Sequence, residues 1–268
     1  MKKKYIALIV FAALGIGLTV AGAAGMNFDL TGLTKEREFT TFTTEYEVEG
    51  VMIENLKIDV DASQVKIIDS SSNKIEVTYK SDAEILNFDG TTLNFKPKLS
   101  IKHWYNPFAL FFKNNYEITI GLPSSKDINF LKLDIDACDF SFTNTSLIQD
   151  LDIDVDASTF VMDNVNVVNL MSEIDASEVN IRNNIFEELT LKASASSIDL
   201  KDIKVNDLKF AIDAGSLNAR ILGNKDDYFV NVETSVGSCN LENTSSGDYS
   251  KSIEGTINAG SANIIFVS

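Results

Sequence analysis

Histidine, tryptophan, cysteine and arginine are scarce in this sequence of 268 residues. It holds one histidine, one tryptophan and two cysteines, and its arginines are Arg37, Arg182 and Arg220. The chain therefore lacks the paired cysteine and histidine ligands of a zinc site. A glycine-rich phosphate loop and the nucleophile elbow of a hydrolase are missing as well. These absences argue against the enzyme classes built on such motifs, and we name no catalytic residue.

Helical patterns are also missing from the region beyond the N-terminus, where no stretch combines a helical period with capping residues. Instead, a phrase of about a dozen residues occurs eight times. The copies begin at Leu56, Leu131, Leu151, Leu170, Leu189, Leu208, Val230 and Ile253. Five of them follow one another about every 19 residues, and a fixed short period is typical of stacked repeat architectures.

The clearest copy, residues 151–162, alternates apolar and polar residues in two short runs. Leu151, Ile153 and Val155 form the first run, and Phe160 and Met162 belong to the second. Such alternation is typical of a strand with one buried face. Each copy is therefore predicted to contain two strands, followed by a short return that is rich in asparagine and aspartate.

A corner of small residues separates the two strands of each copy. Ala157 and Ser158 occupy it in the copy at 151–162, and the first corner residue is alanine in seven of the eight copies. Glycine replaces the serine in the last copies. We expect the alanine to point inward at a tight bend where only a small side chain fits, and serine or glycine to suit the bend itself.

One such unit cannot bury its apolar face alone, whereas units stacked about 4.8 Å apart form continuous parallel sheets around an apolar centre. The sequence therefore predicts an all-β fold: a single-stranded parallel β-solenoid, similar to a β-helix, with coils of about 19 residues. An antiparallel sandwich is the alternative, but of its hairpin signals only Asp89-Gly90 fits. The solenoid is the favoured interpretation.

The N-terminus combines three lysines with about 20 apolar residues, enough to span a bilayer. We expect residues 1–25 to form a signal-anchor transmembrane helix, residues 26–50 a stalk, and residues 51–268 the repeat domain. The lysines should remain in the cytoplasm, which gives a single-pass protein of the cell membrane with its C-terminal domain outside. The alternative is a secreted protein, because Ala21-Gly-Ala23 resembles a cleavage site.

The net charge limits the classes of partner, and the cysteine spacing argues against a disulfide. The net charge of −16 argues against nucleic acid, anionic lipid headgroups and anionic wall polymers, and it allows cationic partners or divalent metal. Cys138 and Cys239 lie in copies five coils apart, which is over about 20 Å and too far for a disulfide.

Aspartates recur just before the corner alanine, among them Asp136, Asp156, Asp175 and Asp213. Like positions align in a stack, so carboxylates about 5 Å apart repel one another unless something compensates. Bound Ca²⁺ is one compensation. The other is a turn in which each carboxylate accepts a corner N–H. Asn258 replaces aspartate in the last copy and can accept the same bond, so this second interpretation is favoured and no cofactor is expected.

The segment 103–116 interrupts the repeat and is the most aromatic part of the exported region. Its aromatic residues are our candidate partner-binding residues: Trp104, Tyr105, Phe108, Phe111, Phe112 and Tyr116. The segment could bind a partner or rest on the membrane near the anchor. It could equally be an end cap that covers the apolar edge of the first coil. The lone His103 is expected to be structural.

The last residues, 262–268, have the pattern of a strand without a charged end. A terminal coil of this kind is an open edge that invites pairing. We therefore expect the domain to self-associate through this end.

Two features resemble a known bacterial family. They are the segment 116–123, which ends in Leu-Pro just before the regular copies, and the phrase Ile-Asp-Ala-Ser/Gly at 174–177 and 212–215. Over about residues 50–268 the chain resembles the "putative adhesin" strand-repeat proteins, a domain family of unknown function. The resemblance implies a surface-exposed, membrane-tethered solenoid, and some relatives are encoded with cell-envelope stress systems. It brings no catalytic residues.

These observations favour a non-catalytic extracytoplasmic binding or adhesion module that contacts an envelope or surface component. The alternative is an accessory protein of envelope-stress signalling that contacts a membrane sensor through the insert or the anchor. A carbohydrate-active enzyme is the least favoured interpretation. Parallel β-helix enzymes cluster carboxylates with basic residues or calcium in a cleft, whereas the aspartates here are periodic.

Overall fold

The structure is a computed structural model that describes residues 40–48, 50, 52–61, 63–81, 86–95 and 116–267. These ranges belong to one compact unit. The expected anchor at 1–25 and the insert residues 103–115 lie outside them, and of Tyr116 only the backbone is described. Within the described ranges, no helix has the length and apolar character needed to cross a membrane.

Sixteen strands of the described residues form a single sheet. Those before the insert are β1 (Thr40–Glu47), β2 (Met52–Asp61), β3 (Ser63–Ser70), β4 (Lys74–Ser81), β5 (Leu86–Phe88) and β6 (Thr92–Phe95). Those after it are β7 (Tyr116–Pro123), β8 (Asp127–Asp136), β9 (Asp139–Phe142), β10 (Ile148–Asp156), β11 (Thr159–Asp163), β12 (Val167–Asp175), β13 (Glu178–Arg182), β14 (Ile185–Leu222), β15 (Tyr228–Cys239) and β16 (Lys251–Val267).

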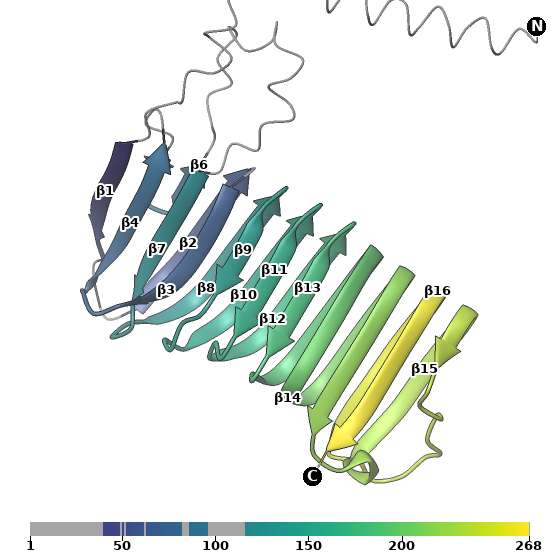
Figure 1. Cartoon of the computed structure of the whole chain (residues 1–268). Helices are drawn as coiled ribbons and strands as arrows, with labels where there is room; N and C mark the ends of the chain where they lie inside the picture. Colours follow the sequence, from purple (N-terminus) through teal and green to yellow (C-terminus); the bar gives the residue numbers. More distant parts are fainter. Residues whose placement is uncertain are drawn as a thin grey trace, which may run out of the picture. The chain divides into compact units, whose positions relative to one another are not determined.

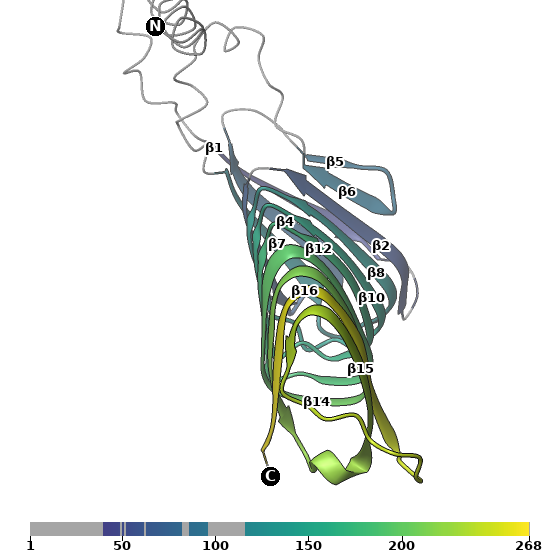
Figure 2. The ribbon, with the colours of Figure 1, turned by 90° about the vertical axis from the view of Figure 1, so that its right-hand side faces the viewer.

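The sheet turns at the corners, so each regular copy of the repeat contributes to two arms (Figure 1 and Figure 2). Each copy first enters what we call the front arm, which contains β2, β8, β10 and β12, and then the back arm, which contains β3, β9, β11 and β13, in these orders along the stack. The back arm is the one that faces the viewer in Figure 1. The long β14 pairs with both arms. The regular copies pair in parallel, whereas β1, β4 and β7 are antiparallel to their neighbours in this order, as are β5 and β6.

The register of the sheet follows the repeat. Leu151 of β10 pairs with Leu131 of β8 on one side and with Leu170 of β12 on the other. All three side chains are at most 2% exposed, so each apolar position forms a buried row along the stack. The prediction of an all-β fold with a largely parallel sheet is confirmed. The hairpin signal Asp89-Gly90 joins β5 to β6.

The corners differ from the expectation. The corner alanines are exposed, and Ala157 and Ala176 adopt left-handed backbone conformations with φ of 48°. The residue that points inward is the next one, Ser158 or Ser177, which is buried. Two successive outward residues shift the alternation by one step, and the left-handed residue makes the bend. The prediction of an inward alanine is therefore wrong, because the alanine lies on the outside of the bend and not in the core.

Residues 40–47, which we expected to belong to the stalk, form a strand at the edge of the back arm. Phe42 and Tyr46 of β1 are half-buried against the core, as alternation with polar residues requires. The ammonium of Lys126 fixes the chain after β1 by donating to the backbone oxygens of Val48 at 2.6 Å and Gly50 at 2.8 Å. The threonine-rich composition comes from the outward face of this strand, so the stalk boundary at residue 50 is wrong for these residues.

The last strand of the chain lies inside its predecessor over residues 251–262. β16 lies between β14 and β15, pairing in parallel with both, and Figure 1 shows β15 beyond it. The connection at 240–250 is long enough for the chain to return from the end of β15 to a position between β15 and β14. The expectation of a terminal edge at residues 262–268 therefore holds only in part: Ala262 pairs with Cys239 of β15, whereas residues 263–267 extend past the end of β15 and pair only with β14 among the described residues.

Candidate functional site

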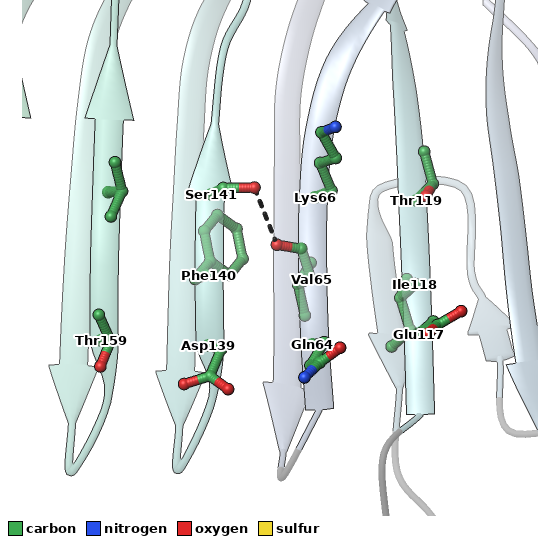
Figure 3. A pocket seen from close by; sticks show the side chains of 11 residues that line it. Gln64, Val65, Lys66, Glu117, Ile118, Thr119, Asp139, Phe140, Ser141 and Thr159 are labelled. Atoms are coloured by element: carbon green, nitrogen blue, oxygen red, sulfur yellow. Dashed lines mark hydrogen bonds between the residues drawn. The ribbon is translucent and has the colours of Figure 1, made fainter.

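A groove of about 510 Å³ lies over the outer face of the back arm. Strands β7, β3, β9 and β11 form it, and Figure 3 shows the side chains that line it. The strand order places residues 64–66 between residues 117–119 and residues 139–141. The groove therefore sits where the irregular first copy meets the regular ones.

Outward side chains line the groove in two rows that run across the strands. The first row is Thr159, Asp139, Gln64 and Glu117, and the second is Val161, Ser141, Lys66 and Thr119. Neighbouring strands in a sheet lie about 4.8 Å apart. Hydroxyl, amide, carboxylate and ammonium groups are thus arrayed closely enough to contact one ligand together.

The base of the groove is packed and rigid. Val65, Ile118 and Phe140 are at most 3% exposed, and the Phe140 ring stacks on Phe160 with centroids 5.5 Å apart. The hydroxyl of Ser141 donates to the backbone oxygen of Val65 at 3.5 Å, as the dashed line in Figure 3 marks. A ligand would meet a largely preformed surface, which reduces the ordering cost of binding.

Charge in the groove is mixed. Lys66 is exposed and has no ion pair among the described residues, while Glu117 and Asp139 stand in the other row. An isolated ammonium beside two carboxylates and several hydroxyls suits a polar, hydroxyl-rich ligand better than a polyanion. The arrangement supports binding by hydrogen bonds from and to the protein.

The corner aspartates form a row in the middle copies. Asp136, Asp156 and Asp175 pair with one another in register. The pKa values of Asp136 and Asp156 are raised, first by partial desolvation and then by neighbouring carboxylates. Asp213 lies apart from this run, beside Asn258, whose Nδ2 donates to its Oδ1 at 2.5 Å. In the described part of the chain, no three such side chains are placed to hold a metal ion.

A serine hydroxyl, not an aspartate carboxylate, accepts the N–H of the second corner residue, while the N–H of the corner alanine bonds to a backbone oxygen of the next coil. The hydroxyl of Ser158 accepts from the N–H of Cys138 at 2.9 Å and donates to the oxygen of Asp156 at 2.7 Å. The hydroxyl of Ser177 likewise accepts from the N–H of Ser158 at 3.0 Å. None of the described corner aspartates accepts a backbone N–H, so the expected aspartate turn is wrong. The available signal was the serine that follows each alanine.

Aromatic side chains of β1, β4, β5 and β6 contact one another at the first coil of the stack. Phe42 stacks on Tyr79 at 5.0 Å, Tyr79 meets the edge of Phe95 at 6.3 Å, and Tyr46 lies 4.3 Å from Phe88 between centroids. The last of these contacts joins β1 to β5, which end the two sides of the sheet. The described strands thus supply aromatic cover for the first coil. Trp104, Tyr105, Phe108, Phe111 and Phe112, the candidate partner-binding residues, lie outside the described ranges.

The groove has no recognisable motif in the sequence. Its residues are ordinary polar side chains from four strands, and only the strand order brings them together. Small outward residues such as Thr119 and Ser141 leave the surface low on either side of Lys66, but they become neighbours of Lys66 only through the strand order.

Comparisons with known proteins agree with the fold. The family model described as Toastrack DUF4097 matches residues 53–266. A solved "putative adhesin" from Bacteroides fragilis NCTC 9343 is 13% identical, and the match covers 84% of this chain and 97% of that chain with a TM-score of 0.52. At this identity the likeness shows the fold alone. No curated protein sequence matches.

Two solved structures from Parabacteroides distasonis ATCC 8503 are also similar, each over 84% of this chain and 97% of the other. A "putative lipid binding protein" is 13% identical with a TM-score of 0.45, and a "putative adhesin" is 12% identical with a TM-score of 0.47. These scores are too low to support an argument about function.

Proposed function

The chain belongs to the Toastrack family DUF4097, and from this premise we propose that it is a non-catalytic binding module of the bacterial cell envelope. The proposal includes a single-pass anchor at residues 1–25 and a stacked β-solenoid held outside the cytoplasm. The groove on the back arm is its binding surface, and an uncharged, hydroxyl-rich envelope polymer is its ligand.

The groove is the observation that supports this proposal. Its two rows expose donors and acceptors over a base that packing has already ordered. Rows repeat along the strand at the spacing of alternate residues, so a chain of sugar units could lie across the strands and meet similar groups at successive steps. The strongly acidic chain, with a net charge of −16, would repel a polyanion of the same envelope.

The test is co-sedimentation of the full-length protein, in detergent, with isolated cell-wall glycan. Ser141→Trp places an indole in the centre of the groove and should lower binding at least about tenfold, because that factor corresponds to only about 1.4 kcal/mol. Ser141 is half-exposed on the outer face, so the core beneath should stay intact.

The matched control is Asn180→Trp. Asn180 of β13 continues the same outward row beyond Val161 but does not line the groove. It should bind as the unmodified protein does. Equal binding by both variants, or no binding by the unmodified protein, would contradict the proposed surface and ligand class.

A second candidate function is supported by the aromatic cover at the first coil. Phe42, Tyr46 and Phe88 contribute this cover from the described strands, which would leave the insert 103–116 available for a partner. Its six aromatic residues would then contact a membrane sensor of the envelope-stress response. In this role the protein is a signalling accessory.

Crosslinking in cells distinguishes the two functions. The full-length tagged protein and a variant lacking residues 103–116 are crosslinked and purified. Capture of a membrane sensor that is lost on deletion supports the accessory role. Recovery of wall polymer by both forms supports the groove, and recovery of wall polymer only by the form with the insert argues that the groove is not the contact.

A further inference from the structure

The outer edge of β15 is partly covered by the connection that follows it. The N–H of Val230 donates to the hydroxyl of Thr244 at 2.9 Å, and the N–H of Thr244 donates to the oxygen of Val230 at 2.9 Å. The side-chain amide of Asn243 bonds in the same way with both the N–H and the oxygen of Val232, at 2.7 and 3.2 Å. The connection therefore imitates a further strand and satisfies the edge in the front arm.

A similar cap covers the other arm. The side chain of Asn240 accepts from the N–H of Ile264 and donates to its oxygen, both at 2.8 Å. Ile264 belongs to β16, which is the outermost backbone of the stack beyond the end of β15. The edge beyond β15 is thus blocked at Ile264, whereas residues 265–267 have no partner strand on that side among the described residues.

Between the two caps a short edge is uncovered. Residues 234–238, Thr-Ser-Val-Gly-Ser, are all exposed, and Val236 is 73% exposed. In the described chain their contacts are limited to the ladder with β16. The segment has no charge and no proline, the features that usually protect an exposed edge from pairing.

We propose that Thr234–Ser238 is a docking edge for a second copy of this chain. A twofold axis through Val236 would pair the two segments in antiparallel fashion, with Thr234 opposite Ser238 of the copy. Glu233 at the margin would then face Cys239, so no like charges oppose each other, although the chain as a whole is strongly acidic. The caps confine the pairing to about five residues, which predicts a weak dimer that forms where a membrane concentrates the chains.

This inference goes beyond the proposed binding function and does not depend on it. The pair would hold two grooves in one particle, and two weak contacts with a polymer would then act together. Self-association was expected through residues 262–268, of which residues 265–267 are the competing edge; in the proposed dimer the pairing edge is on β15 instead.

Disulfide trapping tests the pairing directly. In the full-length protein, Val236→Cys should give a covalent dimer under mild oxidation in the envelope, because directly opposed residues have Cβ atoms about 4.5–5.5 Å apart. Met171→Cys is the control, since Met171 is 51% exposed but lies on the front arm away from the edge. Cys138 and Cys239 are present in both variants.

A second measurement covers the case in which the cysteine variant crosslinks by chance encounter. Val236→Lys should reduce the dimer fraction of the detergent-solubilised chain in analytical ultracentrifugation by about tenfold, because a charge would oppose its copy across the axis. Ile265→Lys, at a residue 47% exposed on neighbouring β16, should retain the dimer. Equal crosslinking of the two cysteine variants, or an unchanged dimer in Val236→Lys with a native circular dichroism spectrum, would overturn the proposal.

Discussion

The corners of the middle copies and those of the last copies turn at the same place in the repeat, but with different residues and backbone conformations. In the middle copies an exposed left-handed alanine precedes a buried serine, as at Ala176 and Ser177. In the last copies the serine is replaced by Gly215, Gly260 and Gly237, whose φ values are 141°, 145° and 157°. The repeat therefore fixes where the chain turns, while the residue after the alanine decides how neighbouring coils contact each other.

The two contacts have different physical origins. A buried serine hydroxyl bonds to the adjacent coil and fills the corner. At Gly215 the backbones approach so closely that a Cβ would lie 2.0 Å from the oxygen of Ser196. The corners of the middle copies depend on hydrogen bonds, whereas those of the last copies depend on the absence of a side chain. Each type of corner should therefore be destabilised when the residue of the other type is introduced.

The largest expected effect is that of Gly215→Ala. Its φ of 141° is hard for an L residue to adopt, and the added methyl group would collide with the backbone of the next coil. We expect a loss of about 3 kcal/mol or more in the free energy of unfolding, measured by chemical denaturation. Ala176→Gly is the control: glycine adopts φ of 48° without strain, so its stability should change by less than about 1 kcal/mol. Similar losses in both would contradict the distinction between the corners.

A smaller loss is expected for Ser177→Ala. The substitution removes the bond from the hydroxyl to the oxygen of Asp175 at 2.7 Å and leaves the buried N–H of Ser158 without its acceptor. This should cost about 1–3 kcal/mol in the same assay. The exposed Ser197→Ala should stay within about 0.5 kcal/mol of the unmodified protein. A neutral Ser177→Ala would show that the serine row does not hold the corners.

We expect Ser172→Val to stabilise the folded protein. This substitution extends the comparison from the corners to the rows of core residues. Ser172 interrupts the apolar row between Ile153 and Leu191, and a cavity of about 10 Å³ lies beside it. Its hydroxyl reaches the oxygen of Thr190 only at 3.4 Å. Filling this space should raise the free energy of unfolding by about 1 kcal/mol. If Ser172→Ala proved more stable than Ser172→Val, the row would already be full.

The smallest effect concerns charge. The corner aspartates form a row in the middle copies, whereas Asp213 in the last copies lies beside Asn258. The raised pKa of Asp156 means that protonation favours the folded state. The penalty from its charge is fully present above the folded pKa, and it disappears as the pH falls below the ordinary value of 3.8. Asp156→Asn should therefore raise the Tm slightly at pH 7, because Asp156 is exposed and its charge is screened, and it should lose this advantage near about pH 3. The same gain at both pH values would contradict repulsion within the row.

Much of the fold could be predicted from the sequence because it depends on local periodicity. Leucine at a fixed spacing gives both the strand faces and the register, as the pairing of Leu131, Leu151 and Leu170 shows. The corner could not be resolved in this way, since alternation alone does not reveal that Ala157 and the residue before it both point outward. Composition was misleading at Thr40–Glu47, where the outward face of a strand resembles a stalk.

Long-range order was beyond sequence reasoning for a different reason. The copies at Val230 and Ile253 carry nearly the same pattern, so either could end the stack, and only their contacts place β16 inside β15. The groove likewise exists because β3 lies between β7 and β9, both of which are distant from β3 in sequence. Features that depend on the order of strands in space leave little trace in local pattern.

The most direct test of the central claim is a photo-crosslinking residue placed at position 141 of the full-length protein in living cells, compared with the same residue at position 180. The account predicts adducts with envelope polymer from position 141, where the groove lies, and few from position 180, which continues the same row outside it. Equal adducts from the two positions, or none from position 141 while the protein is recovered bound to the envelope, would contradict a binding function of the groove.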